Sequence, residues 1–389
     1  MMKGLHLTVA IVGVGHTDFR STTPDVSFKE QMFEAAVKAY ADAGVNARKD
    51  IGSFLTAAED YWEGYSIFDE FVPDQLGAVL RSVCTIGGDG LLALCNGAMQ
   101  IETGLFDVVA IEAHSKASDM LTFDGILSHA LDPIYNRALN AHPYFIAGLE
   151  MQRYLHETKT TREQCASVVV KNKRNAMDNP IAAFPADMTV DEVINSPMVS
   201  HPLTQRDISS LADGMIVMVL ASEKKAKELS DQPIWLKGLG WCSDTPWLEA
   251  RDWGAAGYTN LARGRAYNRA GIKNPRNDID FAEVDDYFSY KELQHLEALK
   301  ICEPGKAGKL TEDGEFNLDG AFPVNVSGGR LGAGNLLEGS ALQSVLECVQ
   351  QLRGHAGKRQ VKNAKTGLAQ SWRSVPTATG CVAILSNEL

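Results

Sequence analysis

An internal repeat restricts the fold of this chain more than any other feature of its sequence. The stretch 39–45, followed by Asp and Ile at 50–51, returns as 266–272, followed by Asp and Ile at 278–279. The two copies are separated by 227 residues at the first stretch and by 228 at the second. A spacing that is kept so closely over two stretches predicts that one structural unit occurs twice.

The same elements flank both copies of the repeat. An apolar stretch with two glycines precedes each copy, at 11–15 and at 236–240, and predicts a strand that ends in a turn. A further predicted strand with acidic residues near its end follows each copy, at 59–61 and at 285–287. The chain is therefore predicted to be a duplicated α/β protein.

The first unit also contains local signals for helices and for an insertion. Ser27 and Glu30 form a predicted capping box for a helix that ends at Gly44. The segment 115–202 is rich in Met, His and aromatic residues and is broken by turns, so we expect a helical insertion there. The predicted domains are a first half at 1–114 and 203–232, the insertion at 115–202, and a second half at 233–389.

The stretch around Cys84 is the strongest candidate for chemistry. Glycines follow at 87, 88 and 90, and an apolar run with helical spacing begins after them. We expect Cys84 to lie at the N-terminus of that helix, where free N–H groups and the helix dipole lower the pKa of a thiol. A buried structural cysteine is the alternative interpretation.

The composition excludes several classes of function. The net charge of −12 is unfavourable for nucleic-acid binding. No apolar run approaches the roughly 18 residues that a membrane span needs, and the first residues lack a signal-peptide pattern. The seven cysteines are scattered without a CxxC pair. This pattern predicts a reducing cytoplasm and no metal site in this chain.

Several motifs together resemble the thiolase family, in particular its archaeal and sterol-carrier-type members. The resembling segments are 84–88 (CTIGG), 168–176 (VVVKNKRNA), 325–329 (NVSGG) and 351–361 (QLRGHAGKRQV). The resemblance covers nearly the whole chain. It implies the thiolase fold, with two βαβαβαββ halves packed as a five-layered αβαβα sandwich and a helical loop domain.

The resemblance also implies a chemistry and a set of site residues. Thiolases cleave a 3-oxoacyl-CoA through an acyl-cysteine, with coenzyme A as cosubstrate and without a covalently bound cofactor. Cys84 matches the nucleophile, and the turn at Gly380 matches part of an oxyanion hole. Asp286 is expected with Gly380 at the oxyanion turn, and the residues expected to bind substrate or CoA are Ser327, Gly328, Gly329, His142 and His201.

The sequence departs from the family where thiolases carry their acid–base residues. The family's His-Asp-Cys-Phe box reads Asp-Asp-Tyr-Phe at 285–288, and its Gly-His-Pro reads Gly-Asn-Leu at 334–336. Asn335 therefore replaces the histidine base, although an amide cannot act as a base. Glu338 and Tyr287 are the predicted substitutes, and Asp285 or Asp286 is a candidate for a carboxylic acid that stays protonated.

Three functions follow from these matches and departures. The first is a thiolase for an unusual substrate, for which benzoylsuccinyl-CoA is the suggested example. The second is a thiolase-fold aldolase that cleaves a β-hydroxyacyl-CoA and depends on tyrosine, which Tyr287 fits and Cys84 does not. The third is a non-catalytic scaffold subunit. The resemblance further implies a homodimer and a small zinc-ribbon/OB-fold partner, which would hold any zinc.

Overall fold

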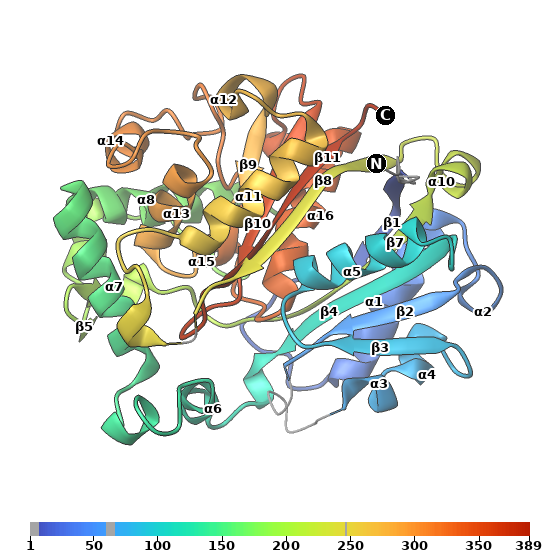
Figure 1. Ribbon diagram of the computed structural model, residues 1–389, viewed down its shortest axis with the longest axis horizontal. Helices are drawn as coiled ribbons and strands as arrows, with labels where there is room; N and C mark the ends of the chain where they lie inside the picture. The colour runs from blue at the N-terminus through green and yellow to red at the C-terminus, as the bar shows by residue number, and fades with distance from the viewer. Residues whose placement is uncertain (1–7, 60–66, 246) are drawn as a thin grey trace.

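A nine-stranded mixed sheet is the central element of the protein (Figure 1). The structure is a computed structural model that describes residues 8–59, 67–245 and 247–389. The strand order is β3-β2-β4-β7-β1-β8-β11-β10-β9. The bounds are β1 (Val9–His16), β2 (Ser53–Ala57), β3 (Ser82–Ile86), β4 (Val108–Lys116), β7 (Asp213–Ser222), β8 (Ile234–Ser243), β9 (Phe281–Glu283), β10 (Thr366–Trp372) and β11 (Thr379–Ser386).

The sheet confirms the predicted duplication. The two halves meet where β1 pairs with β8 through Ala10–Trp235 and Ile11–Ile234. Outward from this seam, β1-β7-β4-β2 in the first half corresponds to β8-β11-β10-β9 in the second. Only β3 lacks a named counterpart among the described residues, because the second half has a single bridge there, between Val324 and Ala282.

Helices cover both faces of each half. Helix α1 (Phe28–Ala43) packs on β1 and β7, and α11 (Gly257–Ala270) packs on β8 and β11. Helices α5 (Gly90–Glu102) and α16 (Gly339–Arg353) contact each other and share one apolar core with strands of both halves. This arrangement of outer and central helices around sheet layers is the predicted thiolase architecture.

Repeated glycines explain why the outer helices lie so close to the sheet. A Cβ on Gly15 would lie 2.1 Å from the backbone oxygen of Ala35 in α1. A Cβ on Gly240 would lie 2.1 Å from the backbone oxygen of Ala262 in α11. Only glycine allows this approach, so the paired glycines fix the same helix position in both halves. The capping box of Ser27 and Glu30 is also confirmed.

The predicted insertion lies outside the nine-stranded sheet. Its elements are α6 (Phe123–His129), α7 (Pro143–Thr158), α8 (Arg162–Asn175), α9 (Val190–Ile194), and the hairpin of β5 (Met198–Ser200) and β6 (Leu203–Thr204). The exact domain limits at 114, 202 and 232 stay a prediction.

Shorter helices complete the described structure. They are α2 (Ala47–Asp50), α3 (Phe68–Phe71), α4 (Pro73–Leu76), α10 (Glu223–Leu229), α12 (Pro275–Asp278), α13 (Ser289–Ala298), α14 (Ala307–Glu312) and α15 (Gly329–Ala333). Among all helices in the described ranges, none has the length and apolar character to cross a bilayer. Asp60 and Tyr61, which belong to the acidic end predicted for the first copy, lie outside the described residues.

Candidate active site

Cys84 does not lie at a helix N-terminus, so this prediction is wrong. It is the central residue of β3, its Cα partner is Leu55 of β2, and its side chain is exposed. Helix α5 begins only at Gly90, where Asp89 caps it by accepting the N–H of Leu92 at 2.9 Å. The strand continues past Cys84 because its pairing with β2 extends to Ile86.

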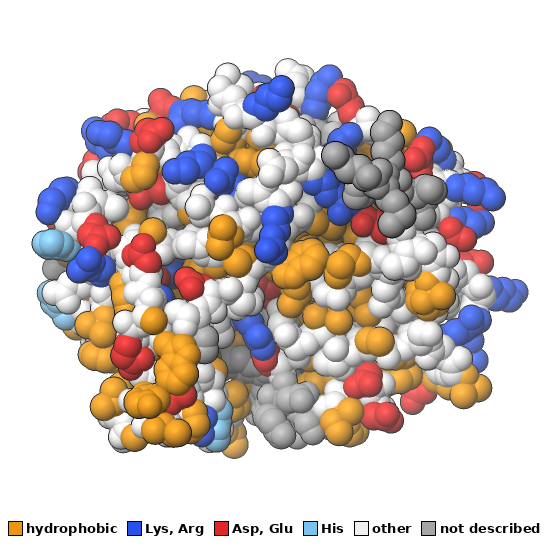
Figure 2. All heavy atoms as spheres, in the orientation of Figure 1, with side chains coloured by type: hydrophobic (Ala, Val, Ile, Leu, Met, Phe, Trp, Pro, Cys, Tyr) orange, Lys and Arg blue, Asp and Glu red, His pale blue; other side chains and the backbone are white. Residues whose placement is uncertain are grey.

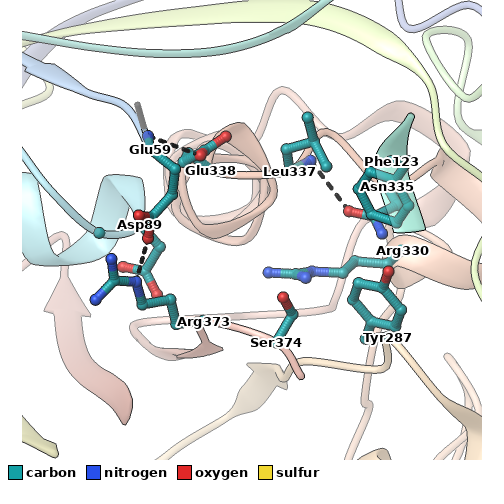
Figure 3. A pocket seen from close by; sticks show the side chains of 11 residues that line it. Glu59, Asp89, Phe123, Tyr287, Arg330, Asn335, Leu337, Glu338, Arg373 and Ser374 are labelled. Carbon is teal, nitrogen blue, oxygen red and sulfur yellow. Dashed lines mark hydrogen bonds and ion pairs between the residues drawn. The ribbon is translucent and has the colours of Figure 1, made fainter. Parts of the chain in front are cut away.

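A pocket forms instead where the ends of several strands meet the starts of α5 and α16 (Figure 3). The described residues that line it are Glu59, Gly88, Asp89, Phe123, Tyr287, Arg330, Asn335, Leu337, Glu338, Arg373 and Ser374. Glu59 follows β2, Tyr287 follows β9, and Arg373 follows β10. The carboxyl ends of neighbouring strands are a frequent place for a binding site in open α/β sheets.

Three of the four predicted catalytic residues lie in this pocket. Tyr287, Asn335 and Glu338 line it, whereas Cys84 does not, and no cysteine is found among its described lining residues. The pocket has a volume of only about 20 Å³, which is room for about one water molecule. A thioester can therefore enter only after some of the lining side chains move.

Asn335 presents an amide donor to the pocket. Its side chain is fully buried, and its Oδ1 accepts the N–H of Leu337 at 3.0 Å and the hydroxyl of Ser340 at 3.3 Å. These bonds identify the oxygen, and Nδ2 has no hydrogen-bond partner within the described ranges. A buried unpaired donor is costly, so Nδ2 is suited to an acceptor oxygen of a bound substrate.

Glu338 lies beside Asn335, as the sequence predicts. It occupies the N-cap position of α16 and is 7% exposed. Its Oε1 accepts the backbone N–H of Glu59 at 2.9 Å, which joins the two halves of the chain across the pocket (Figure 3). A carboxylate held in this position can accept a proton from a substrate hydroxyl.

Arg330 extends its guanidinium group into the pocket (Figure 3). Its Nη2 lies 2.8 Å from Oδ2 of Asp285 and 3.3 Å from the backbone oxygen of Trp372. Its guanidinium carbon is 5.7 Å from the centre of the Tyr287 ring. Asp285 occupies the position of the family's histidine, and burial raises its pKa although Arg330 opposes this effect. The lost histidine is thus replaced by an ion pair.

Tyr287 is joined to the insertion through a second tyrosine. Its hydroxyl lies 3.3 Å from the hydroxyl of Tyr144, near the start of α7. Burial and the neighbouring Tyr144 raise the pKa of Tyr287 well above its usual value. The phenol is therefore neutral near pH 7 and can donate a hydrogen bond or a proton.

His142 lies next to this pair but has a structural position. It is exposed and is the N-cap of α7, where its Nδ1 accepts the N–H of Tyr144 at 3.0 Å. It does not line the pocket, and its role in substrate binding stays a prediction. Its ring centre is 4.9 Å from that of Tyr144, so it helps to orient the tyrosine.

Asp286 supports the pocket from behind and does not line it. Its carboxylate accepts the backbone N–H groups of Arg330 at 2.6 Å and Leu331 at 3.1 Å, and a hydrogen bond from Asn172 at 2.8 Å. Burial, and then the charge of Glu292, raises the pKa of Asp286 to about 7. Its contacts fix the start of α15, and hence the backbone of Arg330.

The Ser-Gly-Gly turn is buried and lies outside this pocket, and its role in CoA binding stays a prediction. The hydroxyl of Ser327 donates to Glu283 at 2.5 Å. Gly328 has a φ of +99°, and a Cβ on Gly329 would lie 2.3 Å from the Asp286 carboxylate. The turn therefore needs glycine for packing, because any side chain there would displace α15.

The two remaining predicted residues also lie away from the pocket. Gly380 is part of β11, between β8 and β10, and a Cβ there would lie 2.5 Å from the backbone oxygen of Ser371. Gly380 therefore lies in a strand and not in the predicted turn, and its role in an oxyanion hole stays a prediction. His201 is exposed and belongs to the turn between β5 and β6, where it does not line the pocket.

The sequence analysis missed a second group of charges in the pocket. Arg373 forms an ion pair with Glu59 (Figure 3). Asp89 is buried, and this burial raises its pKa although the hydrogen bond from the Leu92 N–H and the charges of Arg330 and Arg373 oppose the effect. Asp89 directly precedes an apolar helical run, so N-cap preference could have identified it. No local pattern marks Arg373.

Comparison with known proteins agrees with this architecture. Residues 244–387 match the family described as "Thiolase C-terminal domain-like". The chain is 33% identical over 371 residues to the acetyl-CoA acetyltransferase of Methanothermobacter thermautotrophicus, covering 93% of this chain and 95% of that one. The chain belongs to the thiolase superfamily. The sequence-based prediction of the family is thereby confirmed.

Other similar proteins in this superfamily carry different activities in their names. The benzoylsuccinyl-CoA thiolase subunit BbsB of Thauera aromatica is 28% identical over 287 residues. The alignment covers 73% of the present chain and 72% of BbsB. Among solved structures, the Ltp2-ChsH2(DUF35) aldolase superimposes with a TM-score of 0.84 at 24% identity, with 97% of each chain covered. The solved acetyl-CoA acetyltransferase of Syntrophomonas wolfei superimposes with a TM-score of 0.75 at 17% identity, over 98% of this chain and 100% of that one, which confirms the thiolase fold.

Proposed function

We propose that this protein catalyses an aldol reaction on a β-hydroxyacyl-CoA. The bond between the α and β carbons breaks, and an aldehyde or ketone and a shorter acyl-CoA are released. The observation that carries this proposal is the position of Cys84 on an exposed edge strand, away from the pocket. A thiolase needs a thiolate to hold the acyl group, whereas an aldolase needs no covalent intermediate.

Glu338 is the proposed base. It lines the pocket, and its carboxylate accepts a hydrogen bond from the backbone N–H of Glu59 in the first half of the chain. In the cleavage direction it takes the proton of the β-hydroxyl group, and the electrons of that O–H bond form the new carbonyl. The electrons of the broken carbon–carbon bond pass to the thioester as an enolate.

Arg330 and Asn335 are the proposed stabilisers of that enolate. The guanidinium group of Arg330 and Nδ2 of Asn335 both belong to the pocket and both supply donors. Donors that are already oriented before the reaction stabilise a developing oxyanion strongly, and removal of one such donor costs about 10²–10³ in rate. Asp285 holds the guanidinium group in place.

Tyr287 is the proposed acid that protonates the α carbon of the enolate. Its phenol is neutral, and the hydroxyl of the half-buried Tyr144 at 3.3 Å lies beside it to return a proton. Tyr144 takes its own proton from water, and Glu338 gives its proton to water once the products have left. The fold of the Ltp2-ChsH2(DUF35) aldolase supports this chemistry on the same scaffold.

A thiolase reaction through an acyl-Cys84 is the second candidate, favoured by the names of the acetyltransferase and benzoylsuccinyl-CoA thiolase relatives. The two candidates differ in substrate and in their need for Cys84. The decisive experiment incubates the protein with a β-hydroxyacyl-CoA, and separately with a 3-oxoacyl-CoA plus CoA, and quantifies the carbonyl product and the CoA esters by mass spectrometry.

For the aldolase we expect carbonyl release from the β-hydroxyacyl-CoA. Cys84→Ser should keep the rate within about twofold, whereas Glu338→Gln and Tyr287→Phe should lose about 10² or more, since each removes a proton transfer. Cleavage of the 3-oxoacyl-CoA that depends on Cys84 would refute the aldolase and support the thiolase. No turnover with either substrate in the presence of the partner subunit would support a scaffold function.

The edge strand β3 supports the proposed homodimer. It pairs with β2 on one side, and its side chains are exposed or half-buried. An antiparallel pairing of two β3 strands centred on Cys84 would place the two thiols opposite each other, within the Cα separation that a disulfide allows. Mild oxidation should then cross-link the wild type into dimers but not Cys84→Ser, and a wild type that stays uncross-linked would contradict this interface.

An apolar surface of the insertion supports a protein partner. Its exposed residues are Leu121, Ile134, Tyr135, Leu139, Phe145 and Leu149, and Trp247 of the second half joins them through its contact with Tyr135. Figure 2 shows hydrophobic side chains gathered at the lower left, where α6 and α7 lie in Figure 1. We propose that a small zinc-ribbon/OB-fold subunit binds at this surface. The similar aldolase structure, whose name includes a DUF35 component, supports such a partner.

A further inference from the structure

A separate hollow of about 490 Å³ lies between the C-terminal end of α7, the start of α11 and the end of α13. Its lining residues are Glu157, Thr158, Asp252, Gly254, Ala255, Ala256, Gly257, Asn260, Gln294, Glu297, Ala298, Lys300, Pro304 and Gly305. It shares no lining residue with the candidate active site within the described parts of the chain. Neither the aldolase nor the thiolase reaction uses it.

A buried glutamine presents an unused donor to this hollow. Gln294 is 2% exposed, and its Oε1 accepts a hydrogen bond from Nζ of Lys291 at 2.8 Å. That contact fixes the orientation of the amide, because a lysine can only donate. Nε2 has no partner among the described residues. An unpaired buried donor costs about 1–3 kcal/mol, so an acceptor at this position would be stabilising.

The N-terminus of α11 opens into the same hollow. This 14-residue helix begins at Gly257, and its N-cap residue, Ala256, makes no side-chain capping hydrogen bond. Ala255, Ala256 and Gly257 all line the hollow. The first N–H groups of a helix lack internal partners and lie at the positive end of the dipole, so they favour a negatively charged or acceptor group.

Acidic side chains line another part of the wall. Asp252 is exposed, and its Oδ1 accepts the N–H of Gly254 at 2.9 Å. The carboxylate of Glu157 covers Gly254 so closely that a Cβ there would lie 1.7 Å from it, and it also pairs with Arg153 at 2.5 Å. These carboxylates repel a simple anion and attract an ammonium group.

The other charged groups of the wall do not change this balance. Glu297 already accepts hydrogen bonds from Tyr154 at 3.0 Å and from the N–H of Gly305 at 2.9 Å. Lys300 is exposed and is the single cation among the described lining residues. A metal ion is not favoured, because no group of three or more His, Cys, Asp or Glu in the described ranges is arranged to hold one.

We propose that this hollow binds a small zwitterion of the free amino-acid class. Its carboxylate accepts hydrogen bonds from Nε2 of Gln294 and from the first N–H groups of α11. Its ammonium group faces Glu157 and Asp252. The ligand needs both charges for tight binding, because the hydrogen-bond donors and the carboxylates line the same hollow.

Isothermal titration calorimetry of the whole chain tests this site. The probes are glycine, β-alanine and 4-aminobutyrate, whose charges are increasingly separated, with acetate and methylammonium as single-charge controls. We expect at least one zwitterion to bind and both controls to bind at least tenfold more weakly. Acetate or methylammonium that binds as tightly as the best zwitterion would overturn the proposal, and so would the absence of heat with all three zwitterions.

Two variants separate the two ends of the ligand. Gln294→Glu keeps an acceptor for Lys291 and removes the donor, and Asp252→Asn keeps an acceptor for the Gly254 N–H and removes the charge. Each should weaken binding of the best zwitterion about tenfold, which corresponds to about 1.4 kcal/mol. The exposed control Asp313→Asn should leave the affinity unchanged.

Unchanged binding in Asp252→Asn refutes the proposed ammonium contact, whatever the outcome with Gln294→Glu. Because Asp252 is at the surface, this variant should fold even if Gln294→Glu does not, and circular dichroism checks both. Wild-type levels of binding in a folded Gln294→Glu variant would equally refute the carboxylate contact.

Discussion

The two halves of this protein share a scaffold but contribute unequally to the pocket. Gly15 and Gly240 bring a helix onto corresponding strands at the same distance. In contrast, the pocket takes its tyrosine, its amide and both of its arginines from the second half. The duplication therefore explains the architecture, while the proposed chemistry depends mainly on side chains of the second copy.

The largest expected change in stability comes from comparing two ion pairs, Asp285–Arg330 within the second half and Glu59–Arg373 between the halves. Asp285→Asn should lower the free energy of unfolding by about 3–5 kcal/mol, because it leaves the buried guanidinium group of Arg330 without its counter-charge. Glu59→Gln should cost at most about 1 kcal/mol, because Glu59 and Arg373 are 25% and 31% exposed in their side chains.

Urea denaturation of both variants measures this difference. Equal losses of stability would show that the pair in the second half is no more important for folding than the pair that includes Glu59.

Glycine substitutions test whether the two copies are equivalent. Gly15→Ala and Gly240→Ala should each lower the free energy of unfolding by about 1–3 kcal/mol, since each new Cβ would meet a backbone oxygen at 2.1 Å. Gly264→Ala is the control, because nothing lies within 4 Å of its Cβ position in α11. It should raise stability by up to about 1 kcal/mol. Thermal unfolding of the three variants checks the order.

A smaller effect is expected from a buried acid of the second half. The pKa of Asp286 in the folded chain is about 7, above the ordinary aspartate value of 3.8. The folded chain then binds this proton more tightly than the unfolded chain, so the stabilisation is present at low pH and is lost as the pH rises towards 7. The wild type should lose on the order of 1 kcal/mol per pH unit through this group between pH 4 and 7.

Asp286→Asn should flatten this dependence, and the exposed Asp18→Asn in the first half should leave it unchanged. Unfolding free energies at pH 5, 6 and 7 provide the test. A slope in Asp286→Asn equal to that of the wild type would assign the pH dependence to other groups.

The sequence was sufficient to predict the fold and part of the pocket. The repeat predicts the halves because strand and helix patterns, and the glycines between them, depend on local periodicity. Tyr287, Asn335 and Glu338 were found because they replace or neighbour residues of family motifs. The helix start was misplaced because pairing of β3 with β2, which carries the strand past Cys84, is not a local property.

Other residues of the pocket depend on contacts between distant parts of the chain. Arg330 reaches the pocket because Asp285 pairs with its side chain and Asp286 holds its backbone. Nothing near Arg330 in the sequence predicts this. His142 is the N-cap of α7, as a polar residue immediately before a proline often is, and its predicted contact with substrate stays a prediction.

The absence of sulfur from the described pocket wall has a practical consequence under the proposed mechanism. Hydrogen peroxide and mercurial compounds inactivate enzymes whose catalysis depends on a reactive thiol. Here the exposed sulfur of Cys84 would be modified at the margin of the sheet. Substrate turnover by this protein would continue under the same treatment.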